Sequence, residues 1–493
     1  MGKSPDIVQY RRGIYPLMSK LASRSDDTWT HFSAGSKGEG FSSVFESDTD
    51  RLYIHKHIAC TLHGATEATR AANKTVLQME NTVPGYYKLR PAYVSKELEE
   101  LTNALLTPNG HLSAEGFAKY ILEKQSKLFE GDYWKVQKMQ GPSAPLKRGL
   151  FFADNVYAFA CADSEEILQD WVSRPRPHQW WLPPSLKQEV VKEVSFLVPL
   201  GSKTDTDQND EWRICFILGE QKLVYSFSQG QMKLYMLLKM TKDAVFKSIC
   251  DDMSSFVMKN VVFWLSEENA EEDFHIDNLC VMYNKALVKL REAVSTRSLP
   301  YFMIPGRNLF QCKIRDDEQE ALLMTLDEMI QEGPRSLNRI PKLQGLLERA
   351  DEETTAQTAG ERDKLEKLKL DSVLIYAKDW TLQMTEKEKT TVPWSRKDFR
   401  DVVYKMYDLV WPDWKECLLS DAEIVLPVKA DMTEEQTREL HEHYLQRQGT
   451  VVDLVWPYWK GDWNLPMELN DDTRDRITRC VAAVVLRIHS RLT

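Results

Sequence analysis

The sequence of 493 residues contains no long apolar segment and only eight cysteines. No run approaches the roughly 18 consecutive apolar residues of a membrane-spanning helix, and the N-terminus lacks the charged-then-apolar pattern of a secretory signal peptide. Met1-Gly2 resembles the start of a myristoylation site, but Asp6 stands where that site needs Ser or Thr. The cysteines are scattered without paired spacing, which favours reduced thiols over a disulfide framework. We therefore expect a cytoplasmic protein that has no membrane partner.

The net charge of −10 is distributed unevenly along the chain. Residues 1–313 contain 38 Lys and Arg against 38 Asp and Glu, whereas residues 314–493 contain 26 basic and 36 acidic residues. The excess of acid therefore lies entirely in the C-terminal part. An acidic total does not exclude nucleic-acid binding by the first part, because its basic residues can still gather on one face.

The length predicts two or three domains, since it exceeds that of one ordinary domain. Strand-like apolar segments occur up to about residue 216, and from residue 231 the apolar positions follow a helical period. This helical part ends near residues 300–305, and the remaining ~180 residues are long enough to form a separate unit.

The C-terminal unit shows several local signals. Residues 351–360 are polar and weakly patterned, which predicts a linker or mobile loop. Thr433 and Gln436 form the pattern of a helix-capping box. The segment Asp-Leu-Val-Trp-Pro-Asp-Trp-Lys at residues 408–415 recurs, with Tyr in place of the second Asp, at residues 453–460. Two copies suggest a duplicated structural unit, in which the tryptophans pack in a core.

A pattern suited to phosphate and metal binding lies within residues 35–50. Gly35-Ser36 predicts a tight turn that offers backbone N–H groups and a hydroxyl to a phosphate oxygen. Asp48 and Asp50 share one face of the strand expected here, and two like charges that close remain ionised only if a cation lies between them. Magnesium is the natural candidate, because it prefers carboxylate oxygens and completes its shell with water and substrate phosphates.

A single acid, Asp154, interrupts the apolar strand predicted over residues 149–161. An isolated carboxylate in a buried strand is costly unless something pairs with it. Asp154 either ends the strand or caps a turn, since Asn155 follows it, or it supplies a third ligand to the same metal cluster. The Asp48-x-Asp50 pattern favours the third-ligand interpretation.

Six motifs now stand in order along the first 313 residues: Gly35-Ser36, Asp48-x-Asp50, Asp154, Glu-Trp-Arg-Ile-Cys-Phe at 211–216, Ser-Ser-Phe-Val-Met-Lys at 254–259 and Tyr-Phe-Met-Ile-Pro-Gly-Arg-Asn-Leu-Phe at 301–310. In this order they resemble the cyclic GMP-AMP synthase and Mab nucleotidyltransferase family, especially its invertebrate members, the cGAS-like receptors. The resemblance implies an α+β fold. The fold implied for this chain is a bilobal nucleotidyltransferase fold, with a mixed β-sheet core and a helical second lobe, followed by a mainly helical C-terminal extension. The expected domains are residues 1–200 for the core, 201–313 for the remaining core strands and the helical lobe, and 314–493 for an acidic domain of unknown role.

The resemblance also implies an activity. Active members bind double-stranded nucleic acid and join two nucleoside triphosphates, such as ATP and GTP, into a cyclic dinucleotide that serves innate immune signalling of the STING type. Asp48, Asp50 and Asp154 would be the catalytic acids that hold two Mg²⁺ ions, or Mn²⁺. Phe256 would stack on a base, and Arg213 would reach a base edge or phosphate of the second nucleotide. The implied nucleotide-binding set is Gly35, Ser36, Arg213, Glu220, Lys239, Ser255 and Phe256.

The chain departs from its relatives at the base-facing wall. Cys215 and Ile217 occupy places where members that make cyclic GMP-AMP often have serines, and Phe256 replaces a tyrosine. Hydroxyl groups there help to select bases, so the bases of the product stay open. Residues 219–231 contain neither His nor Cys, whereas the vertebrate DNA sensor has a zinc-binding insertion there. We therefore expect no zinc, and double-stranded RNA rather than DNA as the activator.

Other interpretations remain open. His55-x-His57-x-x-Cys60, with His63 nearby, resembles a metal-binding set, but no distant fourth ligand accompanies it. The lysines at 233, 239, 242 and 247 are either a solvated helix face or phosphate contacts.

Two other functions compete with cyclic-dinucleotide synthesis. One is a catalytically inactive Mab-type protein that binds nucleotides or partners, and the other is an enzyme that adds nucleotides to an RNA end or a protein. Retention of all three acids favours an active enzyme, because an inactive scaffold has no need of converging like charges. We also expect that the protein can oligomerise on its ligand and that the acidic C-terminal unit can shield a basic face.

Overall fold

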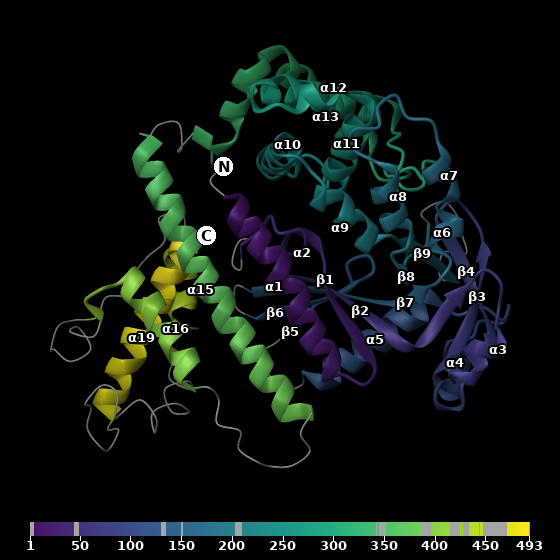
Figure 1. Ribbon diagram of the computed structural model, residues 1–493, viewed down its shortest axis with the longest axis horizontal. Helices are drawn as coiled ribbons and strands as arrows, with labels where there is room; N and C mark the ends of the chain where they lie inside the picture. Colours follow the sequence, from purple (N-terminus) through teal and green to yellow (C-terminus); the bar gives the residue numbers. More distant parts are fainter. Residues whose placement is uncertain are drawn as a thin grey trace.

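The computed structural model describes residues 4–43, 49–129, 135–148, 151–202, 210–341, 343–344, 352–385, 396–414, 424, 426, 433–442, 444–446 and 471–492. Within these residues the fold is α+β, as predicted, with a mixed sheet, a helical lobe beside it and a mainly helical C-terminal unit (Figure 1). No helix among the described residues is both long enough and apolar enough to cross a membrane.

The sheet has nine described strands in the order β1-β2-β3-β4-β9-β8-β7-β6-β5, and β2 also pairs with β7. The long strand β2 pairs antiparallel with β1 through its first half, and parallel with β3 through its second half and with β7. The sheet therefore curves back on itself around β2. The strands are β1 Trp29–Ser33, β2 Thr49–Thr61, β3 Thr75–Asn81, β4 Tyr86–Tyr93, β5 Lys135–Val136, β6 Ser143–Arg148, β7 Phe151–Cys161, β8 Ser195–Val198 and β9 Glu211–Cys215.

Helices surround this sheet and continue into the lobe beyond it. Those nearest the sheet are α1 Pro5–Arg24, α2 Gly35–Gly38, α3 Glu67–Ala71, α4 Glu99–Leu105, α5 Ala114–Leu128, α6 Ser164–Ile167, α7 Gln169–Ser173 and α8 Pro184–Val191. The lobe contains α9 Ile217–Tyr225, α10 Gln229–Thr241, α11 Ser255–Glu268, α12 Leu279–Thr296 and α13 Asp316–Glu332. Ser228 and Gln231 form a capping box that begins α10, and Ser254 caps α11 by accepting a hydrogen bond from the Val257 N–H.

One hydrophobic core joins the sheet to the helical lobe. Phe159 and Trp212 stack in the sheet with ring centroids 4.9 Å apart, and Phe263 and Phe302 meet at 5.2 Å in the lobe. All four belong to one continuous cluster of buried side chains, which also includes Leu322 of α13. The two lobes are thus held at a fixed distance by packing, which is what a site between them requires.

The C-terminal unit has a hydrophobic core of its own. Helices α15 Glu352–Thr385, α16 Arg396–Val410 and α19 Asp471–Leu492 pack together around Trp414, which is 0 % exposed and donates a hydrogen bond from Nε1 to Asp408 Oδ1 at 2.9 Å. The first Trp-Pro-x-Trp segment therefore serves core packing, as predicted. The second, at residues 453–460, lies outside the described residues. The capping box at Thr433 and Gln436 is confirmed by two hydrogen bonds.

The prediction of a linker or loop over residues 351–360 was wrong, because α15 begins at Glu352. The later part of this helix packs on α1, where Leu370 and Leu374 meet Ile14 and Leu21. Adding residues to an existing helix costs far less free energy than nucleating a new one. The part of α15 that packs on α1 therefore allows the helix to extend back through the weakly patterned residues that precede it.

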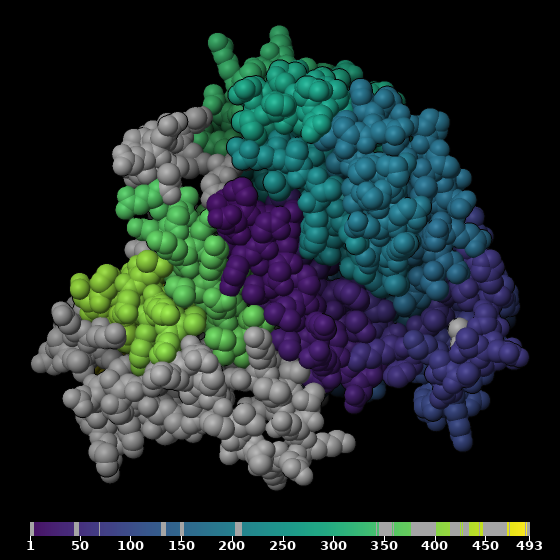
Figure 2. Space-filling view, viewed as in Figure 1, coloured from purple at the N-terminus to yellow at the C-terminus, as the bar shows by residue number. Residues whose placement is uncertain are grey.

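Helix α15 also contacts α1 through a row of acids. Figure 2 shows the green α15 segment lying against the purple N-terminal helix. Asp363 accepts a hydrogen bond from Ser4, and Asp371 accepts one from Tyr10. Between them Glu366 Oε1 accepts a hydrogen bond from Arg11 Nε at 2.8 Å, and the side chains of this ion pair are each 1 % exposed. The acidic C-terminal unit is thus attached to the N-terminal helix by a buried ion pair.

We predict that Glu366→Ala destabilises the protein by about 3–5 kcal/mol, because it leaves the Arg11 charge buried without a partner. Denaturant unfolding measures the loss. The matched control is Glu361→Ala, which removes an exposed carboxylate from the same helix. The double variant Arg11→Met/Glu366→Leu should lose much less stability than Glu366→Ala, since a buried apolar pair needs no counter-charge. Equal losses for Glu366→Ala and Glu361→Ala would contradict the prediction.

Candidate active site

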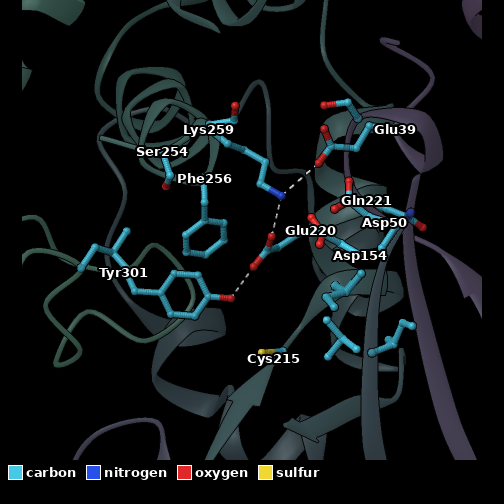
Figure 3. Close-up of a pocket in the computed structure, with 18 of the residues that line it drawn as sticks. Glu39, Asp50, Asp154, Cys215, Glu220, Gln221, Ser254, Phe256, Lys259 and Tyr301 are labelled. Carbon is cyan, nitrogen blue, oxygen red and sulfur yellow. Dashed lines mark hydrogen bonds and ion pairs between the residues drawn. The ribbon is translucent and has the colours of Figure 1, made fainter. Parts of the chain in front are cut away.

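A cavity of about 530 Å³ lies between the sheet and the helical lobe. Its volume is in the range of small-molecule sites. Its walls come from α2, β2, β7 and β9 on the sheet side, and from α9, α10, α11 and residues 301–313 on the lobe side. Figure 3 shows side chains from both walls pointing into the space between them.

Two predicted acids meet on one wall of this cavity. Asp50 on β2 and Asp154 on β7 are partners in the register of parallel neighbouring strands, and both line the cavity. Asp154 lies within β7 rather than at its end, and its Oδ1 accepts a hydrogen bond from Ser143 Oγ at 3.0 Å. Two carboxylates on neighbouring strands fit a divalent cation held by oxygen ligands.

The third predicted acid, Asp48, lies outside the described residues. Within the described part of the chain, no three His, Cys, Asp or Glu side chains converge as a metal-binding group. That finding also applies to His55, His57, Cys60 and His63. Burial lowers the pKa of His55 to about 4, with a further contribution from His57, and His63 forms an ion pair with Glu166 at 2.7 Å.

The Gly-Ser turn packs against Asp50. Gly35 has a φ of +57°, and a Cβ at this position would lie 1.8 Å from Asp50 Oδ2, so only glycine fits. The next residue, Ser36, accepts a hydrogen bond from Lys239, which reaches across from α10. Burial lowers the pKa of Lys239, while nearby acids such as Glu39 oppose the shift. A hydroxyl and an ammonium group therefore converge at the turn beside the two carboxylates.

A buried network of one lysine and two glutamates joins the turn to the lobe. Lys259 Nζ lies 2.9 Å from Glu39 Oε1 and 2.7 Å from Glu220 Oε2 (Figure 3). Tyr301 donates its hydroxyl to Glu220 Oε1 at 2.6 Å, and the Tyr235 hydroxyl lies 3.4 Å from Glu39 Oε2. Burial by itself would lower the pKa of Lys259, but Glu220 and Glu39 outweigh it and raise that pKa. The ammonium group therefore stays charged and fixes α11 against both α9 and the turn.

The helices that contribute Lys239 and Lys259 match a known family model. Residues 230–328 match the family model described as the Mab-21 protein HhH/H2TH-like domain. Most of the helical lobe, from the start of α10 into α13, therefore matches a Mab-21 domain. This family is nucleotidyltransferase-like, which confirms the resemblance inferred from the six motifs, although the match does not distinguish invertebrate members from others. No curated protein matches the chain.

The Mab-21 domain positions the predicted base-binding side chains. Ser255 and Phe256 lie in the first turn of α11 and line the cavity, and the Phe256 ring is tilted against Tyr301 at 5.6 Å. Arg213 and Cys215 line it from β9. Of the predicted site residues that the structure describes, all but Lys239 line this cavity, and Lys239 contacts Ser36, which does line it.

Some residues of the cavity were not predicted. Glu39, Tyr235 and Arg307 line it, and Lys259 completes the ion-pair network. Lys259 and Arg307 fall inside motifs recognised in the sequence, but their partners are distant in the chain. Only the spacing of Lys259 three residues after Phe256, about one helical turn, indicates that the two share a face.

We predict that Mg²⁺ or Mn²⁺ raises the melting temperature of the protein and that Asp50→Asn or Asp154→Asn abolishes this rise. A ligand at 100 times its Kd stabilises the folded state by about 2.7 kcal/mol. Thermal unfolding with and without metal measures the effect. Asp243→Asn is the control, because Asp243 pairs with Lys242 and does not line the cavity. An equal metal-induced shift in all three variants would exclude Asp50 and Asp154 as ligands.

Proposed function

We propose that this protein is a magnesium-dependent nucleotidyltransferase that joins two nucleoside triphosphates into a cyclic dinucleotide. The observation that carries the proposal is a single cavity in which Asp50 and Asp154 face the Ser36 turn and Phe256. Metal-binding, phosphate-binding and base-stacking groups within one cavity are the parts that nucleotide transfer needs.

Phosphoryl transfer requires positioning and charge neutralisation more than covalent help from the protein. Asp50 and Asp154, together with Asp48, would hold the magnesium ions. When bound, these ions lower the pKa of an attacking ribose hydroxyl and neutralise the departing pyrophosphate. Ser36 and Lys239 would orient the triphosphate through the contact that they already make with each other.

Cyclisation also requires the cavity to bind the linear intermediate in a second, reversed orientation. Phe256 offers only a ring face, and stacking on a ring face tolerates different bases. The wall beside it is formed by Cys215 and Ile217, which carry no hydroxyl groups. The cavity is therefore suited to accept two bases in turn.

The proposal extends to the activator. Double-stranded RNA is favoured over DNA, because residues 219–231 are occupied by α9, a short turn and the beginning of α10, with no zinc-binding insertion among them. We place the enzyme in the cytoplasm, where its product would act as a second messenger in innate immune signalling of the STING type.

The decisive experiment is incubation of the protein with four labelled nucleoside triphosphates and Mg²⁺, with duplex RNA, duplex DNA or neither. We expect a phosphatase-resistant product, formed in greatest amount with duplex RNA. Asp50→Ala and Asp154→Asn should each lower the yield at least about 100-fold, because even outer-shell partners of a metal are worth 10–100-fold. Their melting temperatures without metal serve as the folding control.

No product under any of these conditions would favour an inactive Mab-type protein that binds nucleotides or partners. A linear product attached to RNA or protein would favour the terminal-transferase alternative. An active Asp48→Ala/Asp50→Ala double variant would overturn the assignment of the metal ligands.

We further propose that the C-terminal unit shields part of the N-terminal helix from duplex RNA. The contacts of Asp363 with Ser4 and of Asp371 with Tyr10 support this idea, because acidic side chains cover the face of α1 on which these residues lie. The double variant Asp363→Asn/Asp371→Asn should bind duplex RNA more tightly, measured by fluorescence anisotropy at fixed salt. An unchanged affinity for duplex RNA would contradict the shielding proposal.

A further inference from the structure

The hydroxyl group of Ser4 contacts two helices at once. Its oxygen accepts a hydrogen bond from the Ile7 N–H at 3.3 Å, which caps the N-terminus of α1. The same hydroxyl donates its hydrogen to Asp363 of α15, a helix of the C-terminal unit. The cap uses the oxygen as an acceptor, whereas the contact with α15 uses the hydrogen. A chemical change at this hydroxyl would therefore affect the two helices differently.

The sequence around Ser4 has the form of a kinase substrate. Ser4 is followed by Pro5, and Ser-Pro is the dipeptide on which proline-directed protein kinases act. The chain contains one other Ser-Pro or Thr-Pro dipeptide, at residues 107–108. Ser4 is half-buried, and its backbone is extended, with φ −67° and ψ 151°, as is usual for a residue before proline. An extended Ser-Pro dipeptide that lies before the helix is what such a kinase binds.

The group that meets Ser4 across the interface is a carboxylate. Asp363 accepts the hydrogen of the hydroxyl, and Asp6 lies in the first turn of α1. Lys367, a cation of α15 that faces α1, lies about one turn further along, over the Tyr10 ring at 5.6 Å. The neutral hydroxyl of Ser4 therefore holds Asp363 in place by donating to it.

A phosphate group on Ser4 would break the contact with Asp363 and keep the cap. A phosphoserine carries about −1.5 to −2 charges at pH 7. Because it has lost the hydroxyl hydrogen, it would repel the carboxylate to which that hydrogen was donated. Its phosphate oxygens would still accept hydrogen bonds from the first N–H groups of α1, where a negative charge is favourable. Helix α1 would therefore stay intact while α15 loses a contact.

This contact lies at the beginning of the interface that attaches α15. Helices α1 and α15 run side by side (Figure 1). Glu366, which forms the buried ion pair with Arg11, follows Asp363 by about one turn. The apolar contacts with α1 lie beyond this ion pair, at Leu370 and Leu374. Repulsion at Asp363 would therefore act first on the beginning of α15 and on the ion pair, whereas the apolar contacts hold the later part.

We propose that Ser4 is a phosphorylation site for a proline-directed protein kinase, and that its modification detaches the beginning of α15 from α1. The kinase transfers the γ-phosphoryl group of ATP to Ser4 Oγ. A bond forms between this oxygen and the phosphorus, the bond between the β- and γ-phosphates breaks, and ADP leaves with that electron pair. The hydroxyl proton passes to the catalytic aspartate of the kinase. The site is independent of the proposed function, since it concerns only the contact between two helices.

Hydrogen–deuterium exchange of the full-length protein tests the detachment, with phosphoserine placed at position 4 by genetic code expansion. We expect the amides of residues 361–369 to exchange at least about tenfold faster than in the unmodified protein, because like charges in contact at a half-buried site repel strongly. The first turn of α1 should keep its protection. Phosphoserine at position 107 is the matched control, since Thr107 lies in a loop, where its hydroxyl accepts a hydrogen bond from the His111 N–H.

Two unmodified variants separate the effect of charge from that of the cap. Asn and Asp cap helices about as well as Ser, so Ser4→Asn and Ser4→Asp differ mainly in charge. Ser4→Asp should speed the exchange of residues 361–369. Ser4→Asn should leave it close to the wild-type rate, because its amide can still donate to Asp363.

A third variant inverts the sign of the effect. In Asp363→Lys the phosphate meets a cation, so phosphoserine at position 4 should slow the exchange of residues 361–369 relative to the unmodified variant. With Asp363 present, unchanged exchange would overturn the proposal. Slower exchange would overturn it as well, since it would show that a cation such as Lys367 captures the phosphate and strengthens the contact.

A kinase assay tests the site itself. A proline-directed kinase with ATP should phosphorylate Ser4 in the folded full-length protein, as located by peptide mass spectrometry. Modification of a synthetic peptide of residues 1–12 without modification of the folded protein would overturn the site. None of these measurements involves a metal or turnover of nucleotides by this protein, so their outcome does not depend on synthase activity.

Discussion

The contact of Lys259 with Glu39 and Glu220 is the interaction on which the arrangement of the cavity depends. It joins three pieces of the chain that are distant in sequence: the end of the Gly-Ser turn, helix α9 and helix α11 of the Mab-21 domain. A buried triad of this kind is strongly destabilised by the loss of one member, because the remaining charges then lie uncompensated in a poorly solvated space. The triad fixes the position of the Phe256 ring, which lies about one helical turn from Lys259, relative to the acids on the sheet.

Charged side chains of both signs line the cavity. Asp50 and Asp154 lie on the strands β2 and β7, and Arg213 lies on β9 with Arg307 nearby. Lys259 is paired with Glu39 and Glu220. Two neighbouring carboxylates such as Asp50 and Asp154 become more favourable when a cation binds between them.

Much of the site could be predicted from local sequence. Asp50 was identified by strand alternation and Asp154 by its isolation in an apolar strand, and the register of β2 and β7 then makes them neighbours. Glu39 and Arg307 were missed, because Glu39 pairs with Lys259 and Arg307 contacts Tyr86 and Ile214, all of which are distant in the sequence. No periodicity encodes such contacts, since they form when lobes dock. The helix across residues 352–360 was missed for a related reason: packing on α1 further along the helix overrides weak local preference.

The same ion pair that attaches the C-terminal unit also reaches the Gly-Ser turn. Arg11, which pairs with Glu366 of α15, donates from Nη1 to the Gly40 carbonyl at 3.0 Å. Gly40 closes the segment that begins at Gly35, and a Cβ there would lie 2.9 Å from the Val8 carbonyl of α1. The turn therefore rests directly on α1, and α1 rests on α15. Because these contacts are buried and continuous, a change in how α15 packs on α1 would also alter how α1 supports the turn. The acidic C-terminal unit can therefore influence the candidate active site, although none of its residues lies in the cavity.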